Sequence, residues 1–335
     1  MKKKLAVALI SMSLLLTACG SKTESSNVGN NVNNNNEISQ ESDKEIKVGI
    51  IQFSEHIALD RTREGFIEQL ENDGFKVNAD IVNAQGDLSL IPTASKKFEN
   101  DKVDVIYAIA TPAAQGAKNA VKDIPIIFNA VTDPVATGLV KSNENPEANV
   151  TGVSDYFPIE KQLDNFLEIF PESKSLGLLY STGEANSEAQ IKELKEIVKN
   201  KGINLETVGV NSTNDVPQAM ATIANKSDSY VAIQDNLASS SATVISQKLI
   251  EAKIPSFAGE EGPVENGMLI SDGVDYTQLG REAGKIAKEI KEGREVKDCP
   301  VFFSKDAKRT VNGKTAKALG IDENNKIFEN AKVVD

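Results

Sequence analysis

The chain has 335 residues, 40% of them hydrophobic, and its 49 acidic and 37 basic residues give a formal net charge of −12. A nucleic-acid-binding protein normally has the opposite balance, with a basic face that neutralises phosphates, so nucleic acid is not an expected partner. At roughly 150 residues per domain, the length favours two domains.

The N-terminus has the order of a secretory signal. A basic run at residues 2–4 precedes an apolar segment at 5–16, and Leu16-Thr17-Ala18-Cys19 follows. The apolar segment is shorter than the roughly 20 residues that span a bilayer. Leu-Thr-Ala-Cys also resembles a bacterial lipobox, whose cysteine is acylated as the signal is removed. We therefore predict a signal peptide at 1–18 and a lipid at Cys19 that anchors the chain to the outside of the cell membrane. The alternative is a buried core helix at the start of the protein.

The segment after the predicted lipid has little to bury. Residues 19–45 are mostly Ser, Asn, Glu and Lys, which predicts a disordered tether. Loss of residues 1–18 removes three lysines, so 34 basic and 49 acidic residues remain and the charge becomes −15. Cys299 is then the one other cysteine, so no internal disulfide is expected, and its role is left open.

From residue 46 onward, short β-rich runs alternate with helical patterns. In the first half, strands are predicted at 46–53, 77–82, 103–110, 125–128 and 149–153, with helices at 60–73, 89–100 and from 112. In the second half, strands at 175–180, 203–208, 229–234, 254–257 and 267–271 alternate with helices at 188–201, 216–226 and 239–252. A helix at 278–292 and a mixed ending at 314–334 follow. This alternation predicts parallel sheets covered by helices on both faces.

Two such sets predict an α/β fold with two Rossmann-like lobes. The first lobe is expected to comprise residues 46–154 with about 277–302, and the second residues 155–276 with about 303–335. The chain then crosses between the lobes more than once. Since open parallel sheets bind ligands beyond the carboxyl ends of their strands, a cleft between the lobes is the expected site.

The turns that follow the predicted strands supply the candidate ligand-binding residues. They are Phe53, Glu55, Thr111, Pro112, Ala113, Ala114, Val131, Asp133, Asp155, Asn186, Ser187, Asp235, Asn236, Glu260 and Asp275.

Thr111-Pro112 is the sharpest signal among them. Threonine at an N-cap with proline at the first helical position predicts a helix start. The free amides of such a start, with the positive end of the helix dipole, favour a carboxylate or phosphate. The alternative is a capped helix that binds nothing.

Acidic residues fall at several strand ends. Glu55, Asp133, Asp235 and Asp275 are placed where an ammonium group can be held. Each of them alone is also typical of a turn or a helix cap. Together with an anion site opposite, they predict a zwitterionic ligand such as an amino acid.

Aromatic residues flank the same turns and are candidates to sandwich an apolar side chain. They are Phe53, Phe128, Tyr156, Phe157 and Tyr276, of which Phe128 fits core packing better. Ser187 also has a simpler interpretation, because Asn186-Ser187 with Gln190 resembles a capping box.

Signatures of enzymes are weak. His56 is the single histidine, which excludes a His-based metal cluster, and there is no Gly-x-Ser-x-Gly elbow. Gly313-Lys314-Thr315 imitates the end of a phosphate loop, but Lys308 stands where its first glycine belongs. No catalysis, cofactor or metal is predicted. A surface hydrolase with a triad through His56 is the alternative from another class.

Several segments resemble the ABC-type substrate-binding lipoproteins of the tryptophan/tyrosine-associated family. They are Val-Gly-Ile-Ile-Gln-Phe at 48–53, Ala-Thr-Pro-Ala-Ala-Gln at 110–115, Asn-Ala-Val-Thr-Asp-Pro at 129–134, Asn-Val-Thr-Gly-Val-Ser-Asp at 149–155 and Phe-Ala-Gly-Glu at 257–260. Residues 180–187 and 275–280 are similar too, so the resemblance covers nearly all of residues 46–291.

The resemblance implies a type I periplasmic-binding-protein fold, with three crossovers between the lobes and ligand capture by hinge closure. It implies a monomer that delivers its ligand to an ABC permease. It also implies an aromatic amino acid as ligand, with the carboxylate at 111–113. The chain contains no Trp, so ring stacking has to come from Phe or Tyr. A receptor for another amino acid, a nucleoside or a sugar is the alternative within this class.

Overall fold

A computed structural model describes residues 44–146 and 148–335. The predicted signal peptide, Cys19 and most of the predicted tether lie outside these residues. The first strand begins at Lys44, two residues before the predicted start of the folded part.

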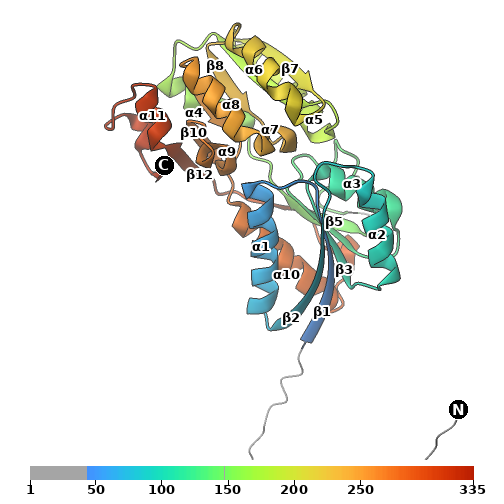
Figure 1. Cartoon of the computed structure of the whole chain (residues 1–335). Coiled ribbons are helices and arrows are strands. Elements are labelled where there is room, and N and C mark those ends of the chain that lie inside the picture. Colours follow the sequence, from blue (N-terminus) through green and yellow to red (C-terminus); the bar gives the residue numbers. More distant parts are fainter. Residues whose placement is uncertain (1–43, 147) are drawn as a thin grey trace, which may run out of the picture. The chain divides into compact units, whose positions relative to one another are not determined.

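The first of two sheets in this part of the chain has six parallel strands in the order β11-β5-β4-β3-β1-β2. Its strands are β1 (Lys44–Gln52), β2 (Phe75–Asn83), β3 (Val105–Ile109), β4 (Ile126–Asn129), β5 (Val150–Ser154) and β11 (Phe302–Phe303). Helices α1 (Ile57–Asn72) and α10 (Tyr276–Lys291) cover one face, and α2 (Leu90–Asn100) and α3 (Thr111–Ala120) cover the other (Figure 1). We call this sheet with its helices the first lobe.

The second sheet has seven strands in the order β13-β12-β10-β9-β8-β6-β7 within the described residues, and β10 and β12 form its antiparallel pair. Its strands are β6 (Ser175–Ser181), β7 (Asn204–Val210), β8 (Ser229–Ala232), β9 (Ser256–Ala258), β10 (Ile270–Gly273), β12 (Lys308–Asn312) and β13 (Ala331–Val334). Its helices are α4 (Ile159–Ile169), α5 (Ala185–Lys201), α6 (Val216–Ala224), α7 (Asn236–Ser240), α8 (Ala242–Glu251), α9 (Glu261–Glu265) and α11 (Gly313–Ala318). Short 3-10 turns lie at Thr213–Asp215 and Lys326–Phe328, and another at Val296–Asp298 lies in the first lobe, just before β11. We call this sheet with its helices the second lobe.

Three connections join the lobes. Residues 155–158 link β5 to α4, residues 274–275 link β10 to α10, and residues 304–307 link β11 to β12. Parallel strands buried on both faces read as apolar runs, as β3 and β4 do. The predicted fold class, α/β with two Rossmann-like lobes, is confirmed.

Two details of the second lobe differ from the sequence analysis. The helix predicted at 239–252 is two helices, because Ser241 leaves the helical conformation between α7 and α8. Helix α4 was not predicted, although Ile159, Leu163 and Phe166 repeat at the spacing of an apolar helix face and are buried.

Glycines let α1 and α10 pack against each other without intervening side chains. A Cβ atom on Gly65 of α1 would overlap the backbone carbonyl of Thr277 at the start of α10. A Cβ atom on Gly280 of α10 would overlap the carbonyl of Thr62 in the same way. The helix pair therefore requires glycine at both positions.

A buried polar chain ties this helix pair to the sheet. Phe66 stacks on Tyr107 of β3 with ring centroids 3.9 Å apart, and Tyr107 donates a hydrogen bond of 3.1 Å to the carbonyl of Thr62. Asn129, the last residue of β4, donates to Tyr107 Oη at 2.9 Å and to the carbonyl of Leu279 at 2.8 Å. These bonds hold both helices in place beside the carboxyl ends of the strands.

We expect Gly65→Ala to destabilise the protein by about 1–3 kcal/mol, because an overpacked helix contact shifts the backbone. Urea unfolding should show a lower midpoint with an unchanged slope. Glu64→Ala, which truncates a side chain that is 68% exposed on the same helix, serves as the control and should change the midpoint little. Equal midpoints for the two variants would contradict the close packing of α1 on α10.

Candidate ligand-binding site

A small cavity lies between the lobes, where the ends of several strands meet. Its volume is about 10 Å³, which is room for about one water molecule. The first lobe contributes His56, Leu59, Ala130 and Thr132, and Tyr276 comes from the start of α10. The connection after β5 contributes Asp155, and the second lobe contributes Asn186, Gln234, Asp235, Asn236, Ser239 and Glu260.

A larger groove adjoins this cavity and shares Asn236 with it. The groove measures about 580 Å³ and is lined by residues that follow β1, β2, β6 and β7 and by helix α7. Apolar side chains in its wall are Phe53, Leu88 and Leu237, and Leu88 is 52% exposed. The cavity and the groove together form the space between the lobes.

Two buried carboxyl groups are occupied in holding α7. Asp235 Oδ1 accepts the amide of Ala238 at 2.9 Å, and its Oδ2 accepts the amide of Ser181 at 2.7 Å and the hydroxyl of Ser187 at 2.6 Å. Glu184 accepts the amides of Asn236 and Leu237 at 3.1 and 3.2 Å. Helix α7 has only five residues and supplies Asn236 and Ser239 to the cavity wall. The hydrogen bonds from its amides to Asp235 and Glu184 therefore hold this part of the wall in place.

Two other buried carboxyl groups keep one oxygen free. Asp155 Oδ2 accepts a 2.7 Å hydrogen bond from the hydroxyl of Tyr276, which links two of the connections between the lobes. Glu260 Oε1 accepts a 2.5 Å bond from Ser239. Asp155 Oδ1 and Glu260 Oε2 are buried and have no hydrogen-bond partner among the described residues, although both side chains line the cavity.

Asn186 adds a third free acceptor to the same cavity. Its Nδ2 donates 2.8 Å to the carbonyl of Gln234, whereas its buried Oδ1 has no partner in the described part of the chain. We call Asp155 Oδ1, Glu260 Oε2 and Asn186 Oδ1 the acceptor cluster. None of the described residues that line the cavity is a lysine or an arginine.

Burial shifts the protonation equilibria of these acids. It raises the pKa of Asp155 to about 6, although the hydrogen bond from Tyr276 and the nearby side chain of Thr132 act in the opposite direction. It raises the pKa of Glu260 to about 7. Burial also raises the pKa of Glu184, with a contribution from the charge of Asp235, and it raises the pKa of Asp235. No lysine or arginine among the described lining residues supplies a positive charge to offset this burial.

The structure brings together part of the set of residues proposed from the sequence. Asp155, Asn186, Asp235, Asn236 and Glu260 line the cavity. Phe53 and Glu55 line the groove, together with Asn236. The remaining ones, which line neither space, are Thr111, Pro112, Ala113, Ala114, Val131, Asp133, Ser187 and Asp275.

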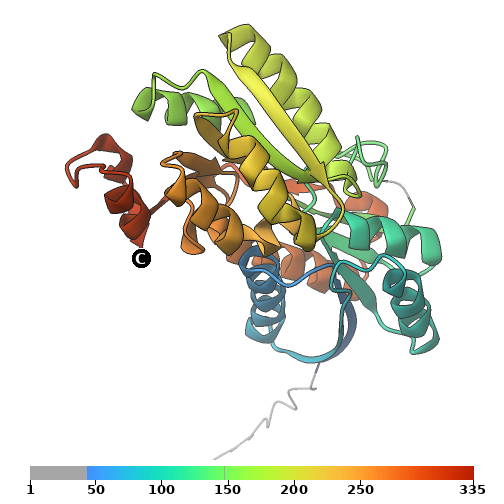
Figure 2. The same cartoon turned by 45° about the horizontal axis from the view of Figure 1, so that its top comes forward.

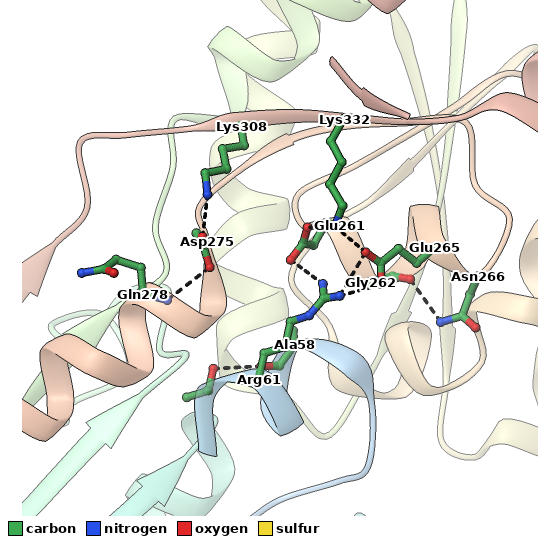
Figure 3. A network of polar contacts seen from close by, with 11 residues as sticks. Ala58, Arg61, Glu261, Gly262, Glu265, Asn266, Asp275, Gln278, Lys308 and Lys332 are labelled. Atoms are coloured by element: carbon green, nitrogen blue, oxygen red, sulfur yellow. Dashed lines mark hydrogen bonds and ion pairs between the residues drawn. The ribbon is translucent and has the colours of Figure 1, made fainter. Parts of the chain in front are cut away.

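Three of the acidic residues expected to hold an ammonium group have other partners in the structure. Both carboxylate oxygens of Asp235 are occupied as described above, so it positions α7. Asp275 caps α10 through the amide of Gln278 and pairs with Lys308 at 2.6 Å (Figure 3). Asp133 accepts the amides of Val135 and Ala136 in its own turn. One oxygen of each carboxylate accepts an amide two or three residues further along the chain, as is typical of turns and helix caps, while distant groups engage the other oxygen of Asp235 and Asp275.

The details of two helix starts also need correction. Thr111 is the first residue of α3, and Ala110, with φ of 81°, is its N-cap. The Thr111 hydroxyl is buried and, within the described residues, has no hydrogen-bond partner. Helix α5 begins at Ala185 with Glu184 as its N-cap, so Ser187 lies inside the helix and bonds Asp235 instead of forming a capping box.

Several wall residues are absent from the list of candidate residues, although two of them, Thr132 and Gln234, lie in the turns that were expected to line the cleft. Thr132, Gln234 and Ser239 line the cavity, and each lies within a few residues of a predicted strand end. Tyr276 was proposed for ring stacking, and in the structure its hydroxyl donates a hydrogen bond to Asp155. Phe128 is fully buried in the core, as expected. Glu184 directly precedes α5, yet its side chain caps no amide of α5 and accepts the amides of α7 instead, so its place before a helix did not indicate this role.

The comparisons with known proteins agree on one family. Residues 47–334 match the family model described as "ABC transporter substrate binding protein". A tyrosine-binding protein of Clostridioides difficile is 41% identical over 313 residues, which are 92% of this chain and 89% of the relative.

Solved structures agree with this result. A domain from Streptococcus pneumonia in complex with L-Trp matches with a TM-score of 0.83 and 34% identity, over 87% of this chain and 100% of that one. The ligand-free, open structure of a substrate-binding protein from Clostridium difficile matches with a TM-score of 0.67 and 41% identity, over 87% of this chain and 99% of that one. Thus the present structure is closer to the complex than to the open protein, even though the open protein is closer in sequence.

We expect the ligand-free protein to lose stability as the pH rises from about 4 to about 7. The folded-state pKa values of Asp155 and Glu260, about 6 and about 7, exceed the values of roughly 4 for unfolded carboxyl groups. The folded state then binds more protons than the unfolded state in this range, so the free energy of unfolding falls with pH.

Urea unfolding at a series of pH values measures this dependence. His56, whose pKa is lowered by burial, acts in the opposite direction, so the wild-type profile needs a reference. The Asp155→Asn/Glu260→Gln double variant retains His56 and should lack the fall due to the two acids. A double variant with the same pH profile as the wild type would disprove the assignment.

Proposed function

The chain belongs to the ABC transporter substrate-binding protein family, and we propose that it captures an aromatic L-amino acid between its two lobes. As a substrate-binding protein of an ABC transporter it is extracytoplasmic, and its family implies delivery of the ligand to a membrane permease.

The acceptor cluster carries this proposal. An ammonium group has three N–H donors and a positive charge, and the cavity presents three buried acceptors, two of them carboxylate oxygens. Leaving such acceptors unpaired is unfavourable, whereas a charge-assisted bond to each of them is favourable. An α-ammonium group supplies both the donors and the charge that the cavity lacks.

The start of α3 is the proposed site for the ligand carboxylate. The first turn of a helix has amides without partners inside the helix, and α3 adds the buried hydroxyl of Thr111. The amide of Ala110 donates 2.9 Å to the carbonyl of Asn129, which places this turn beside Ala130 of the cavity wall. An anion and a cation site at neighbouring strand ends suit a zwitterion.

The groove is the proposed site for the side chain. It adjoins the cavity at Asn236, and Phe53, Leu88 and Leu237 give it an apolar wall. The relatives that bind tyrosine and L-Trp support an aromatic ring there. Because the cavity has room for about one water molecule, the ligand has to enter while the lobes are apart and be enclosed as they close.

We also propose that the protein binds its ligand without catalysis. His56, the sole histidine of the sequence, forms a 3.2 Å hydrogen bond with Asn236 Oδ1 across the lobes. The partner of His56 is thus a side-chain amide. A catalytic triad would instead place the histidine between a nucleophile and a carboxylate. The chain is proposed to act as a monomer with no cofactor, metal or nucleic acid.

The site for attachment to the membrane is proposed to be Cys19. It follows a basic and an apolar segment in the sequence and lies outside the described residues. Within residues 44–146 and 148–335, no helix has the length and apolar character to cross a bilayer.

We expect tryptophan, tyrosine or phenylalanine to bind with one ligand per chain. The sequence has no Trp, so a change in indole emission on mixing with L-Trp reports the ligand itself, and calorimetry gives the affinity of all three. Analogues that lack the amino group should bind roughly ten- to a hundredfold more weakly, because they lose about 1.5–3 kcal/mol of charge-assisted bonding. Binding of a sugar or nucleoside in place of all three amino acids would reject the ligand assignment and leave the family unchanged.

Matched variants separate ligand contacts from structural contacts in the same experiment. Asp155→Asn and Glu260→Gln should weaken amino-acid binding and leave the melting temperature of the free protein equal or higher. Asp235→Ala should instead lower the melting temperature, since loss of a helix cap costs about 1 kcal/mol. The opposite pattern would return the ammonium site to Asp235.

We expect Cys19→Ala to release the protein from the membrane fraction into the medium or periplasm, because a single apolar segment of this length does not anchor by itself. Cell fractionation measures the distribution, and Cys299→Ala is the control that should stay with the membrane. A Cys19→Ala protein that fractionates like the wild type would contradict the lipobox interpretation.

A further inference from the structure

We propose that Arg61 sets the affinity for the ligand without touching it, by clasping the two lobes together through Glu261 and Glu265. Both glutamates lie on α9 of the second lobe, and Arg61 lies on α1 of the first (Figures 1 and 2). This inference rests on the proposed function only where ligand affinity is the readout.

The guanidinium group spans the gap between the lobes with several bonds. Its Nη2 lies 2.9 Å from Glu265 Oε2 and 3.1 Å from Oε1, and its Nη1 bonds Glu261 Oε1 (Figure 3). Lys332 of β13 lies 2.9 Å from Glu265 Oε1 and 3.2 Å from Glu261 Oε2. We call these four residues the inter-lobe clasp. Two positive and two negative charges balance in it.

The clasp is more shielded from water than an ordinary surface ion pair. The side chains of Arg61, Glu261 and Glu265 are 26%, 17% and 18% exposed. Burial alone would raise the pKa of Glu265, but hydrogen bonds from Lys332 and Arg61 outweigh it and lower that pKa, so the group stays charged. Water and salt screen such a pair less than an exposed one.

Within the clasp, Arg61 is the one described member from the first lobe. Lys332 and both glutamates belong to the second lobe, so loss of Arg61 removes the cross-lobe bonds and leaves the Lys332 pairs in place. The backbone comes close at the same point, because a Cβ atom on Gly262 of α9 would lie 3.4 Å from Cβ of Ile57. The clasp therefore forms when α9 lies against α1.

The clasp and the acceptor cluster are built on the same elements. Glu260, which has a free acceptor oxygen in the cavity, is the N-cap of α9 and directly precedes Glu261. Leu59, two residues before Arg61, lines the cavity. Closure that brings Glu260 to the ligand thus also brings Glu261 and Glu265 to Arg61. A bond that favours the closed state raises the apparent affinity by increasing the binding-competent fraction.

The test compares Arg61→Ala with Arg281→Ala, both in the full mature chain kept soluble by Cys19→Ala. Arg281 pairs with Glu68 at 3.0 Å between α10 and α1, so this pair lies wholly within the first lobe and is a matched control. Small-angle X-ray scattering gives the radius of gyration of the ligand-free protein, and calorimetry with L-Trp, L-Tyr and L-Phe gives the affinity.

Arg61→Ala is expected to enlarge the ligand-free protein, to leave the saturated complex at its wild-type size, and to weaken binding about tenfold. Arg281→Ala should match the wild type in all three measurements. Added salt should weaken binding by the wild type more than by Arg61→Ala, because it screens the clasp in the wild type alone.

An Arg61→Ala protein with the wild-type size and affinity would overturn the proposal. So would an equal loss of affinity in Arg281→Ala, since that would be a general charge effect. If the wild type binds no aromatic amino acid, the proposed function fails, and the size of the ligand-free variant still decides whether the clasp holds the lobes together.

Discussion

Carboxyl groups buried in the space between the lobes place the strongest constraint on this protein. A carboxylate removed from water needs hydrogen bonds or a cation, or else it takes up a proton. Asp235 and Glu184 meet this need through the amides of α7 and of Ser181 at the end of β6, and so fix one wall. Asp155 and Glu260 are satisfied through one oxygen only, from Tyr276 and Ser239. Asp235 and Glu184 therefore stabilise the wall of the cavity, whereas Asp155 and Glu260 each keep an oxygen that can bind a positively charged ligand group.

The same residues connect the site to lobe movement. Asp155 lies in the connection after β5 and Tyr276 directly follows the connection after β10, so their hydrogen bond ties two of the crossovers together. Both side chains of this hydrogen bond line the cavity. Tyr107 and Asn129 hold helices α1 and α10 against the first sheet. Helix α9 of the second lobe therefore packs against a helix that is fixed in place, α1. A ligand held by both lobes and a clasp on α1 and α9 then favour the same closed arrangement.

The acidic residues expected at the strand ends differ in their surroundings in the structure. Asp235, Asp155 and Glu260 all line the cavity, yet Asp235 is a cap with both oxygens occupied. Asp275 and Asp133 have the same side chain and a similar position after a strand, but local amides and Lys308 engage them. Whether an acid at a strand end is engaged by protein groups or keeps an oxygen free depends on which donors the fold brings within hydrogen-bond distance.

The sequence by itself determined the alternation of strands and helices, and from it the two mostly parallel sheets and the expectation of a cleft between them. These follow from local patterns, because apolar runs and helical spacing act over a few residues. Only the tertiary structure decided which acceptors stay unpaired, as with Asp155 and Glu260, and which charges meet across the lobes, as with Arg61 and Glu265. Arg61 and Glu265 are 204 positions apart in the sequence, so their contact depends on how the two lobes meet and no local sequence pattern can predict it.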